Sequence, residues 1–193
     1  PRLACSLQPK AVASTPLEIP VPPINDDGKM PALFPTSFPL ERRLVNGLRI
    51  NVRYDATGGR PPLLLLHGFP QTHAMWHAAA ARLRSRFALV MPDLRGYGES
   101  ERPTEGYDVA NLARDVAELI PALGADTATV IGHDWGGAIT WEAISRHPDR
   151  ITRSAVLNCP HPAVMFETLR SSPRQLARSW YMFFFNLPWL PEY

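Results

Sequence analysis

Short apolar runs alternate with segments that suit helices along most of this chain, and this alternation restricts the folds open to it. The runs cover residues 63–66, 87–91, 128–131 and 151–157. Runs this short, with few polar positions, are typical of parallel strands buried on both faces. An earlier stretch, residues 43–54, alternates around Asn46-Gly47, a strong signal for a two-residue hairpin. The pattern predicts an α/β fold with a mostly parallel sheet flanked by helices.

Three helices are expected between these strands. The first covers residues 72–85 or so. The second begins after Asp108, which can cap its N-terminus, and stops at Gly124. The third follows Trp135 and ends before Pro148, because proline cannot continue a helix. Open α/β sheets bind ligands at the carboxyl ends of their strands, so reactive side chains are expected in the loops that follow the strands.

One of these loops leads into the third helix and reads Gly132-His133-Asp134-Trp135-Gly136-Gly137. Small residues around a central reactive residue are typical of the nucleophile elbow, a sharp strand–turn–helix connection. Many hydrolases place serine there, whereas this chain has Asp134. A carboxylate that displaces a leaving group from saturated carbon forms an ester that water can cleave, so Asp134 indicates cleavage of carbon–oxygen or carbon–halogen bonds. The simpler alternative is that Asp134 caps the following helix.

A second loop, His67-Gly68-Phe69-Pro70, follows the first buried run. Hydrolysis of an ester passes through an oxyanion. Two backbone N–H groups usually stabilise it, one just after the nucleophile and one from the loop after strand three. Trp135 and Phe69 occupy these two positions. Alone, the His67 loop could be a simple tight turn, but together with the Asp134 loop it predicts an oxyanion hole.

In these motifs the sequence resembles the α/β-hydrolase superfamily, and most closely its epoxide hydrolase branch. The resemblance covers roughly residues 41–193 and includes the stretches DLRGYGES at 93–100 and LNCPHP at 157–162. It implies an enzyme that opens a small apolar epoxide to a diol through an ester on Asp134, with no cofactor. It also implies that Phe69 and Trp135 donate to the oxyanion, and that the Phe69–Pro70 bond is cis. The residues expected to line the site are His67, Gly68, Pro70, His133 and His161.

The last residues of the chain look like the start of the helical cap that covers epoxide hydrolase sites. Residues 179–188 read SWYMFFFNLP. By this resemblance, Tyr181 is the cap tyrosine that hydrogen-bonds the epoxide oxygen and helps to protonate the leaving alkoxide. A phenol suits an apolar lid because it donates a hydrogen bond without carrying a charge. The alternative is that Tyr181 belongs to an aromatic packing cluster.

Composition and resemblance together divide the chain into three parts. Residues 1–40 are rich in proline, which forbids a regular helix or central strand, so we expect an extended arm or linker. Residues 41–160 are expected to form the N-terminal part of the hydrolase core, and 161–193 the beginning of the cap. In this fold the acid and then the histidine follow the nucleophile along the chain. No histidine after Asp134 fits that role, so we expect a fragment that lacks the last core strands and the catalytic acid and base, with little turnover of its own.

Three other functions stay open. A haloacid dehalogenase of the fluoroacetate type is disfavoured, because Trp135 and Ala138 stand where that family holds its anionic substrate with arginines. A haloalkane dehalogenase shares the tryptophan after the nucleophile, but usually has a polar, halide-binding residue where this chain has Phe69. A noncatalytic remnant of the fold would explain the expected lack of an acid and a base.

Charge and cysteine content argue against several classes of partner. The chain has 20 basic and 18 acidic residues, and the basic residues are scattered, so nucleic acid is not expected as a partner. No apolar stretch reaches membrane-spanning length and no signal peptide begins the chain, so we expect a cytoplasmic protein. The two cysteines are far apart and no Cys/His cluster has ligand spacing, so no metal site is expected. The oligomeric state is not predicted.

Overall fold

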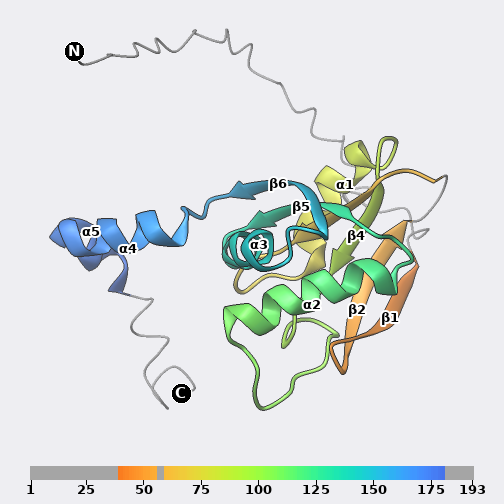
Figure 1. The fold of residues 1–193 in the computed structure, drawn as a ribbon, viewed down its shortest axis with the longest axis horizontal. Coiled ribbons are helices and arrows are strands. Elements are labelled where there is room, and N and C mark those ends of the chain that lie inside the picture. Colours follow the sequence, from red (N-terminus) through yellow and green to blue (C-terminus); the bar gives the residue numbers. More distant parts are fainter. Residues whose placement is uncertain (1–38, 56–58, 181–193) are drawn as a thin grey trace, which may run out of the picture. The chain divides into compact units, whose positions relative to one another are not determined.

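The computed structural model describes residues 39–55 and 59–180 of the protein. In this part of the chain, one sheet has the strand order β1-β2-β4-β3-β5-β6 (Figure 1). Its strands are β1 (Leu40–Val45), β2 (Leu48–Asp55), β3 (Pro62–Leu66), β4 (Ala88–Pro92), β5 (Ala128–His133) and β6 (Ile151–Leu157). β3 pairs in parallel with β4 and β5, and β5 with β6, whereas β1–β2 and β2–β4 are antiparallel. The predicted α/β fold with a mostly parallel sheet is therefore confirmed.

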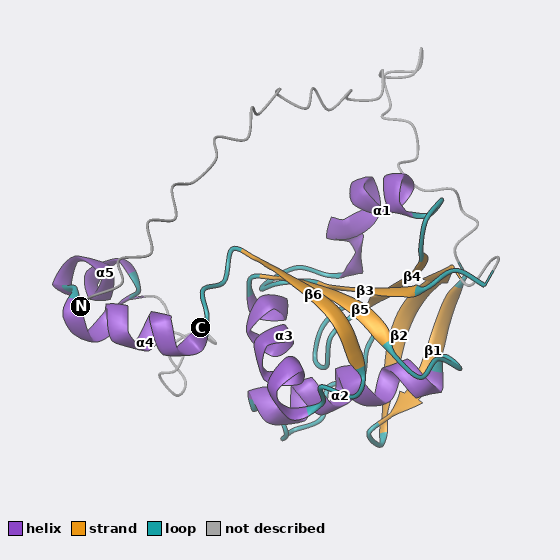
Figure 2. Ribbon diagram, turned by 45° about the horizontal axis from the view of Figure 1, so that its top comes forward, coloured by secondary structure: helices purple, strands orange, loops and turns teal. Residues whose placement is uncertain are grey.

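Helices cover both faces of this sheet, with α2 and α3 on one face and α1 on the other (Figure 2). The helical segments are η1 (a 3-10 helix, His73–Trp76), α1 (His77–Leu83), α2 (Val109–Ala122), α3 (Trp135–Arg146), α4 (Pro162–Ser171) and α5 (Pro173–Arg178). The predicted limits of α2 are confirmed. The Asp108 side chain accepts a hydrogen bond from the Asn111 N–H (3.0 Å), and Gly124 follows the helix with a φ of 79°. The predicted first helix is divided, since the 3-10 turn η1 precedes α1.

The hairpin between β1 and β2 turns at Asn46-Gly47, as predicted. Both residues have positive φ, 49° and 76°, which two-residue hairpins need and which Asn and Gly adopt easily. The Asn46 side chain donates to the Asp115 carboxylate and its N–H donates to Glu118, both at 2.8 Å. The turn is thereby fastened to α2.

Alternation along β3 divides the core between the two faces of the sheet. Residues 63–66 are all leucines that are at most 1% exposed. Leu64 and Leu66 pack with α2 and α3. Leu63 and Leu65 pack on the other face, with Trp76 and Ala80. β3 therefore lies in the middle of the structure, and the loop that follows it starts from a fixed position.

β6 differs from the expected strand that is buried on both faces. Ile151 is buried, but residues 152–155 are exposed. The reason is its place in the sheet, because within the described residues β6 is the last strand and pairs with β5 alone. Its polar residues, Thr152 to Ser154, suit this exposed position.

Several predictions fall on the ends of the chain. Residues 1–38 of the Pro-rich arm and Tyr181 lie outside the described residues. α4 and α5 occupy the first part of the segment expected to be a cap, where they pack on each other and contain no buried residue. No helix in the described ranges has both the length and the apolar character needed to cross a membrane.

Candidate active site

Asp134 lies in the turn between β5 and α3, in an unusual backbone conformation. Its φ is 51° and its ψ is −116°, a combination that non-glycine residues adopt only where the surrounding structure enforces it. The Asp134 N–H donates to the Leu157 carbonyl of β6 (3.0 Å), and its own carbonyl accepts from the Gly137 N–H (2.9 Å). These bonds hold the turn, and the Asp134 side chain is exposed at the carboxyl end of the sheet.

Glycines allow this turn because α3 approaches the strands closely. A Cβ on Gly132 would lie 2.1 Å from the Gly136 carbonyl oxygen, and a Cβ on Gly136 would lie 2.5 Å from the Leu66 carbonyl oxygen. The Thr140 hydroxyl also donates to the Gly136 carbonyl (2.7 Å). The small residues on both sides of Asp134 are therefore required by the packing of backbone on backbone.

The Asp134 carboxylate does not cap α3. No hydrogen bond joins it to the first turn of that helix, so the simpler interpretation of this residue is wrong. Its Oδ1 accepts instead from the Phe69 N–H, at 3.0 Å. The two residues are 65 positions apart in sequence. They meet because β3 and β5 are parallel neighbours, whose following loops leave the same edge of the sheet.

Hydrogen bonds hold the loop that carries Phe69 on both sides of Gly68. His67 is buried; its Nε2 accepts from the Leu94 N–H and its Nδ1 lies by the Gly68 carbonyl oxygen, both at 2.9 Å. The Gln71 N–H donates to the same carbonyl (2.9 Å), and the Gln71 side-chain oxygen accepts from the Gly68 N–H (3.2 Å). The Phe69–Pro70 bond is cis. Gln71 was not among the residues expected in the site, although it lies only three positions after Gly68.

The Trp135 N–H lies beside Asp134, at the first position of α3. Amide groups at the start of a helix have no partner within the helix. In the described part of the chain, no acceptor takes this N–H, while the Trp135 side chain packs partly against the core. The structure thus brings Asp134, Phe69 and Trp135 together at one edge of the sheet.

His133 and His161 were also expected to line the site. His133 ends β5, and its Nδ1 is buried with no hydrogen-bond partner among the described residues. His161 is exposed and caps α4, where its Nδ1 accepts from the Ala163 N–H (3.3 Å). Its ring meets the Trp141 ring edge to face, with centroids 5.0 Å apart. No histidine in the described ranges hydrogen-bonds to Asp134.

Asp93, at the end of β4, anchors the loops beside the site. It is 1% exposed. Its Oδ1 accepts from the N–H and the ring Nδ1 of His73 (2.9 and 2.8 Å), and its Oδ2 accepts from the Asn51 side chain (2.8 Å). Burial alone would raise the pKa of Asp93, but the hydrogen bonds from His73 and Asn51 outweigh it and hold that pKa well below its usual range. A buried carboxylate thus fixes η1 next to the end of β4.

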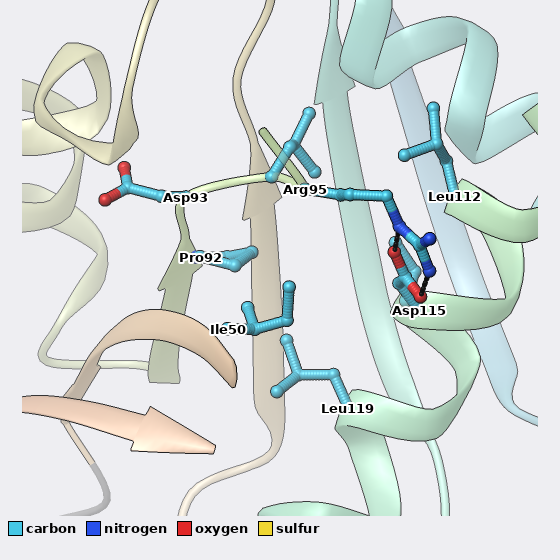
Figure 3. Close-up of a pocket in the computed structure, with 9 residues that line it drawn as sticks. Ile50, Pro92, Asp93, Arg95, Leu112, Asp115 and Leu119 are labelled. Carbon is cyan, nitrogen blue, oxygen red and sulfur yellow. Dashed lines mark hydrogen bonds and ion pairs between the residues drawn. The ribbon is translucent and has the colours of Figure 1, made fainter. Parts of the chain in front are cut away.

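A crevice between β4 and α2 lies apart from Asp134. Figure 3 shows Asp93 pointing away from it and Arg95 pointing toward α2. Arg95 donates two hydrogen bonds to Asp115 (2.8 and 2.7 Å), which raise the pKa of Arg95. The remaining lining is mostly apolar, with Ile50, Pro92, Leu112 and Leu119. We assign this crevice to packing around a satisfied ion pair; within the described ranges no group of His, Cys, Asp and Glu could hold a metal ion.

Comparison with known proteins identifies relatives of this arrangement. A family model described as "alpha/beta hydrolase fold" matches residues 61–190. Human epoxide hydrolase 4 is 37% identical over 150 residues, which are 77% of this chain and 41% of that protein. A solved chain described among novel epoxide hydrolases from metagenomes of hot environments is 36% identical, with a TM-score of 0.74, over 79% of this chain and 52% of its own. A variant epoxide hydrolase from Bacillus megaterium, solved with its diol product, is 32% identical, with a TM-score of 0.71, over 77% and 52%. The chain therefore spans about half of these solved chains, and 41% of the human protein.

Proposed function

Since the chain belongs to the epoxide hydrolase branch of the α/β-hydrolase fold family, we propose that the protein hydrolyses an epoxide to a vicinal diol through a covalent ester on Asp134. The observation that carries this proposal is the 3.0 Å hydrogen bond from the Phe69 N–H to Asp134 Oδ1. It joins a carboxylate nucleophile to a backbone donor that is already in place for an oxyanion. The relatives named epoxide hydrolases supply the substrate class.

In the first step, Asp134 is alkylated. Because Oδ1 is engaged by the Phe69 N–H, Oδ2 is the oxygen that attacks. It forms a bond to one ring carbon of the epoxide, and the bond from that carbon to the epoxide oxygen breaks with its electron pair left on oxygen. The resulting alkoxide needs a proton donor. We assign that role to Tyr181, on the resemblance of its sequence position to the cap tyrosine.

In the second step, water adds to the carbonyl carbon of the Asp134 ester. Negative charge then develops on Oδ1, where the Phe69 N–H lies at the distance expected of an oxyanion donor. The Trp135 N–H is the second donor. Collapse of the intermediate releases the diol and restores the carboxylate. A general base must take a proton from the water as it adds.

The surroundings of Asp134 suit a neutral substrate. Phe69, Trp135 and Ala138 carry no charge, so none of them could compensate the charge of an anionic substrate buried beside Asp134. Phe69 is 52% exposed although it is apolar, so it offers an apolar surface next to the carboxylate. These features support an apolar epoxide over a haloacid.

The test is direct detection of the ester. The full-length protein is mixed rapidly with a simple aryl epoxide and quenched in acid, and the peptide containing Asp134 is weighed by mass spectrometry. We expect a mass increase equal to that of the epoxide in the wild type and none in Asp134→Asn. Halide release from an alkyl chloride without epoxide opening would identify a dehalogenase instead, and the absence of both reactions would leave the noncatalytic remnant.

A further inference from the structure

We propose that His67 is a positioning residue, which turns the Phe69 N–H toward Asp134 by gripping the Gly68 carbonyl. This inference rests on the proposed function, because it concerns the same oxyanion donor. His67 makes no contact with the reacting atoms in this scheme. It acts through one peptide group, the one between Gly68 and Phe69.

The hydrogen bonds of His67 define its protonation. A backbone N–H can only donate, so the Leu94 N–H, 2.9 Å from His67 Nε2, requires a lone pair on that nitrogen. A carbonyl oxygen can only accept, so the Gly68 oxygen, 2.9 Å from Nδ1, requires a proton there. His67 is therefore the neutral imidazole with its proton on Nδ1. The protonated ring would place an N–H at Nε2 directly against the Leu94 N–H.

The grip on Gly68 determines where the Phe69 N–H points. The Gly68 carbonyl and the Phe69 N–H belong to one planar trans peptide, in which the two groups point in opposite directions. His67 holds the oxygen on one side, and the Gln71 N–H donates to the same oxygen at 2.9 Å. The N–H on the other side is left facing Asp134 Oδ1 at 3.0 Å. Rotation of this peptide would break all three bonds together.

The surroundings of His67 keep the ring fixed and neutral. It is fully buried, and the Tyr97 ring meets it edge to face with centroids 5.1 Å apart. Burial lowers the pKa of His67; the Gly68 carbonyl and the Asp93 carboxylate oppose this effect, and His73 adds to it. Among the described residues, Asp93 and His73 act electrostatically on the ring and Tyr97 contacts it. His67 lies at the end of β3, in the middle of the sheet, which makes it a rigid support for the loop.

Two substitutions separate the two hydrogen bonds of His67. In His67→Asn the side-chain amide reaches the place of Nδ1 and can still donate to the Gly68 carbonyl. In His67→Gln the amide reaches the place of Nε2 and can accept from the Leu94 N–H, but the grip on Gly68 is lost. In the full-length protein we expect the Gln variant to lose about 100-fold in kcat, the scale of a misplaced reacting group, with KM little changed. The kcat of the Asn variant should stay within about tenfold of the wild-type value, even if its melting temperature falls as far as that of the Gln variant.

The control is His147→Gln at the end of α3, which should leave kcat unchanged. Nuclear magnetic resonance of the resting protein gives a readout that does not depend on activity. The ring nitrogens of His67 should show a proton on Nδ1 alone, and the Phe69 amide signal should shift in Asp134→Asn and in His67→Gln but not in His67→Asn. A proton on Nε2, or equal losses of kcat in the Asn and Gln variants in step with their stability, would overturn the proposal. A wild type that opens no epoxide would overturn the proposed function, while the ring and amide signals would still decide the role of His67; they also decide it if a variant fails to fold.

Discussion

Replacing Gly68 with alanine should lower kcat by more than its effect on the stability of the fold would explain. The new Cβ would lie 2.6 Å from Asp134 Cβ and 2.7 Å from Oδ1, whereas carbon atoms in contact are about 3.5–4.0 Å apart. The Gly68 loop and the Asp134 turn must therefore separate by about 1 Å, because Asp134 Cβ is not the free end of a flexible chain. A displacement of about 1 Å at the reacting groups can cost about 100-fold in rate, so kcat should fall by about that factor.

The assay is steady-state hydrolysis of an epoxide by the full-length protein, with stability followed by urea unfolding. Gly124→Ala is the matched control. Gly124 has a φ of 79° with nothing near the new Cβ, so alanine there is strained but remote from the site. It should cost about 1–2 kcal/mol of stability and leave kcat unchanged. Gly68 is not among the glycines with positive φ, so its backbone tolerates alanine.

A kcat of Gly68→Ala within a few-fold of the wild-type value would contradict this prediction. So would losses of kcat in Gly68→Ala and Gly124→Ala that are in the same proportion to their losses of stability. Either result would show that the contact between the Gly68 loop and Asp134 does not position the nucleophile.

Three further outcomes follow from the contacts around the site. Asp115→Ala leaves the buried Arg95 cation unpaired and should lower the free energy of unfolding by about 3–5 kcal/mol; a urea titration that shows less than about 1 kcal/mol would contradict this. The pKa of Asp93 is lowered in the folded state, so its stabilisation is present above about pH 4 and is lost as the pH falls through the acid range. In Asp93→Asn, the free energy of unfolding should therefore fall less steeply as the pH is lowered. An unchanged dependence on pH in the acid range would show that Asp93 is not the source of this stabilisation. Thr140→Val removes the hydrogen bond from the hydroxyl to the Gly136 carbonyl and should lower the free energy of unfolding by about 1 kcal/mol, measured by thermal unfolding. An unchanged stability would mean that this bond does not hold the turn.

Sequence predicted the features that depend on neighbouring residues. Asn46-Gly47 forms the hairpin, and Asp108 caps its helix, because each of these signals acts within a few residues. The parallel direction of β3 and β5 was predicted from their apolar character, and their pairing in the structure brings Phe69 to Asp134. Here a local pattern was enough to place two distant loops at one edge.

Sequence could not predict contacts that exist only after the loops pack. Tyr97 meets the His67 ring across the end of β4. This contact has no fixed spacing in sequence. The exposure of residues 152–155 was missed for a related reason, since the burial of a strand depends on its place in the sheet as well as on its own residues.

The central claim is that Asp134 is alkylated and then released by water. A single turnover in heavy-oxygen water, with the full-length protein in excess over the epoxide, tests it most directly. Water adds to the Asp134 carbonyl carbon in this mechanism, so the label should appear in the Asp134 peptide, and the first diol should carry the original carboxylate oxygen. Label in the diol and none in Asp134 would show that water attacks the epoxide directly, and would contradict the account.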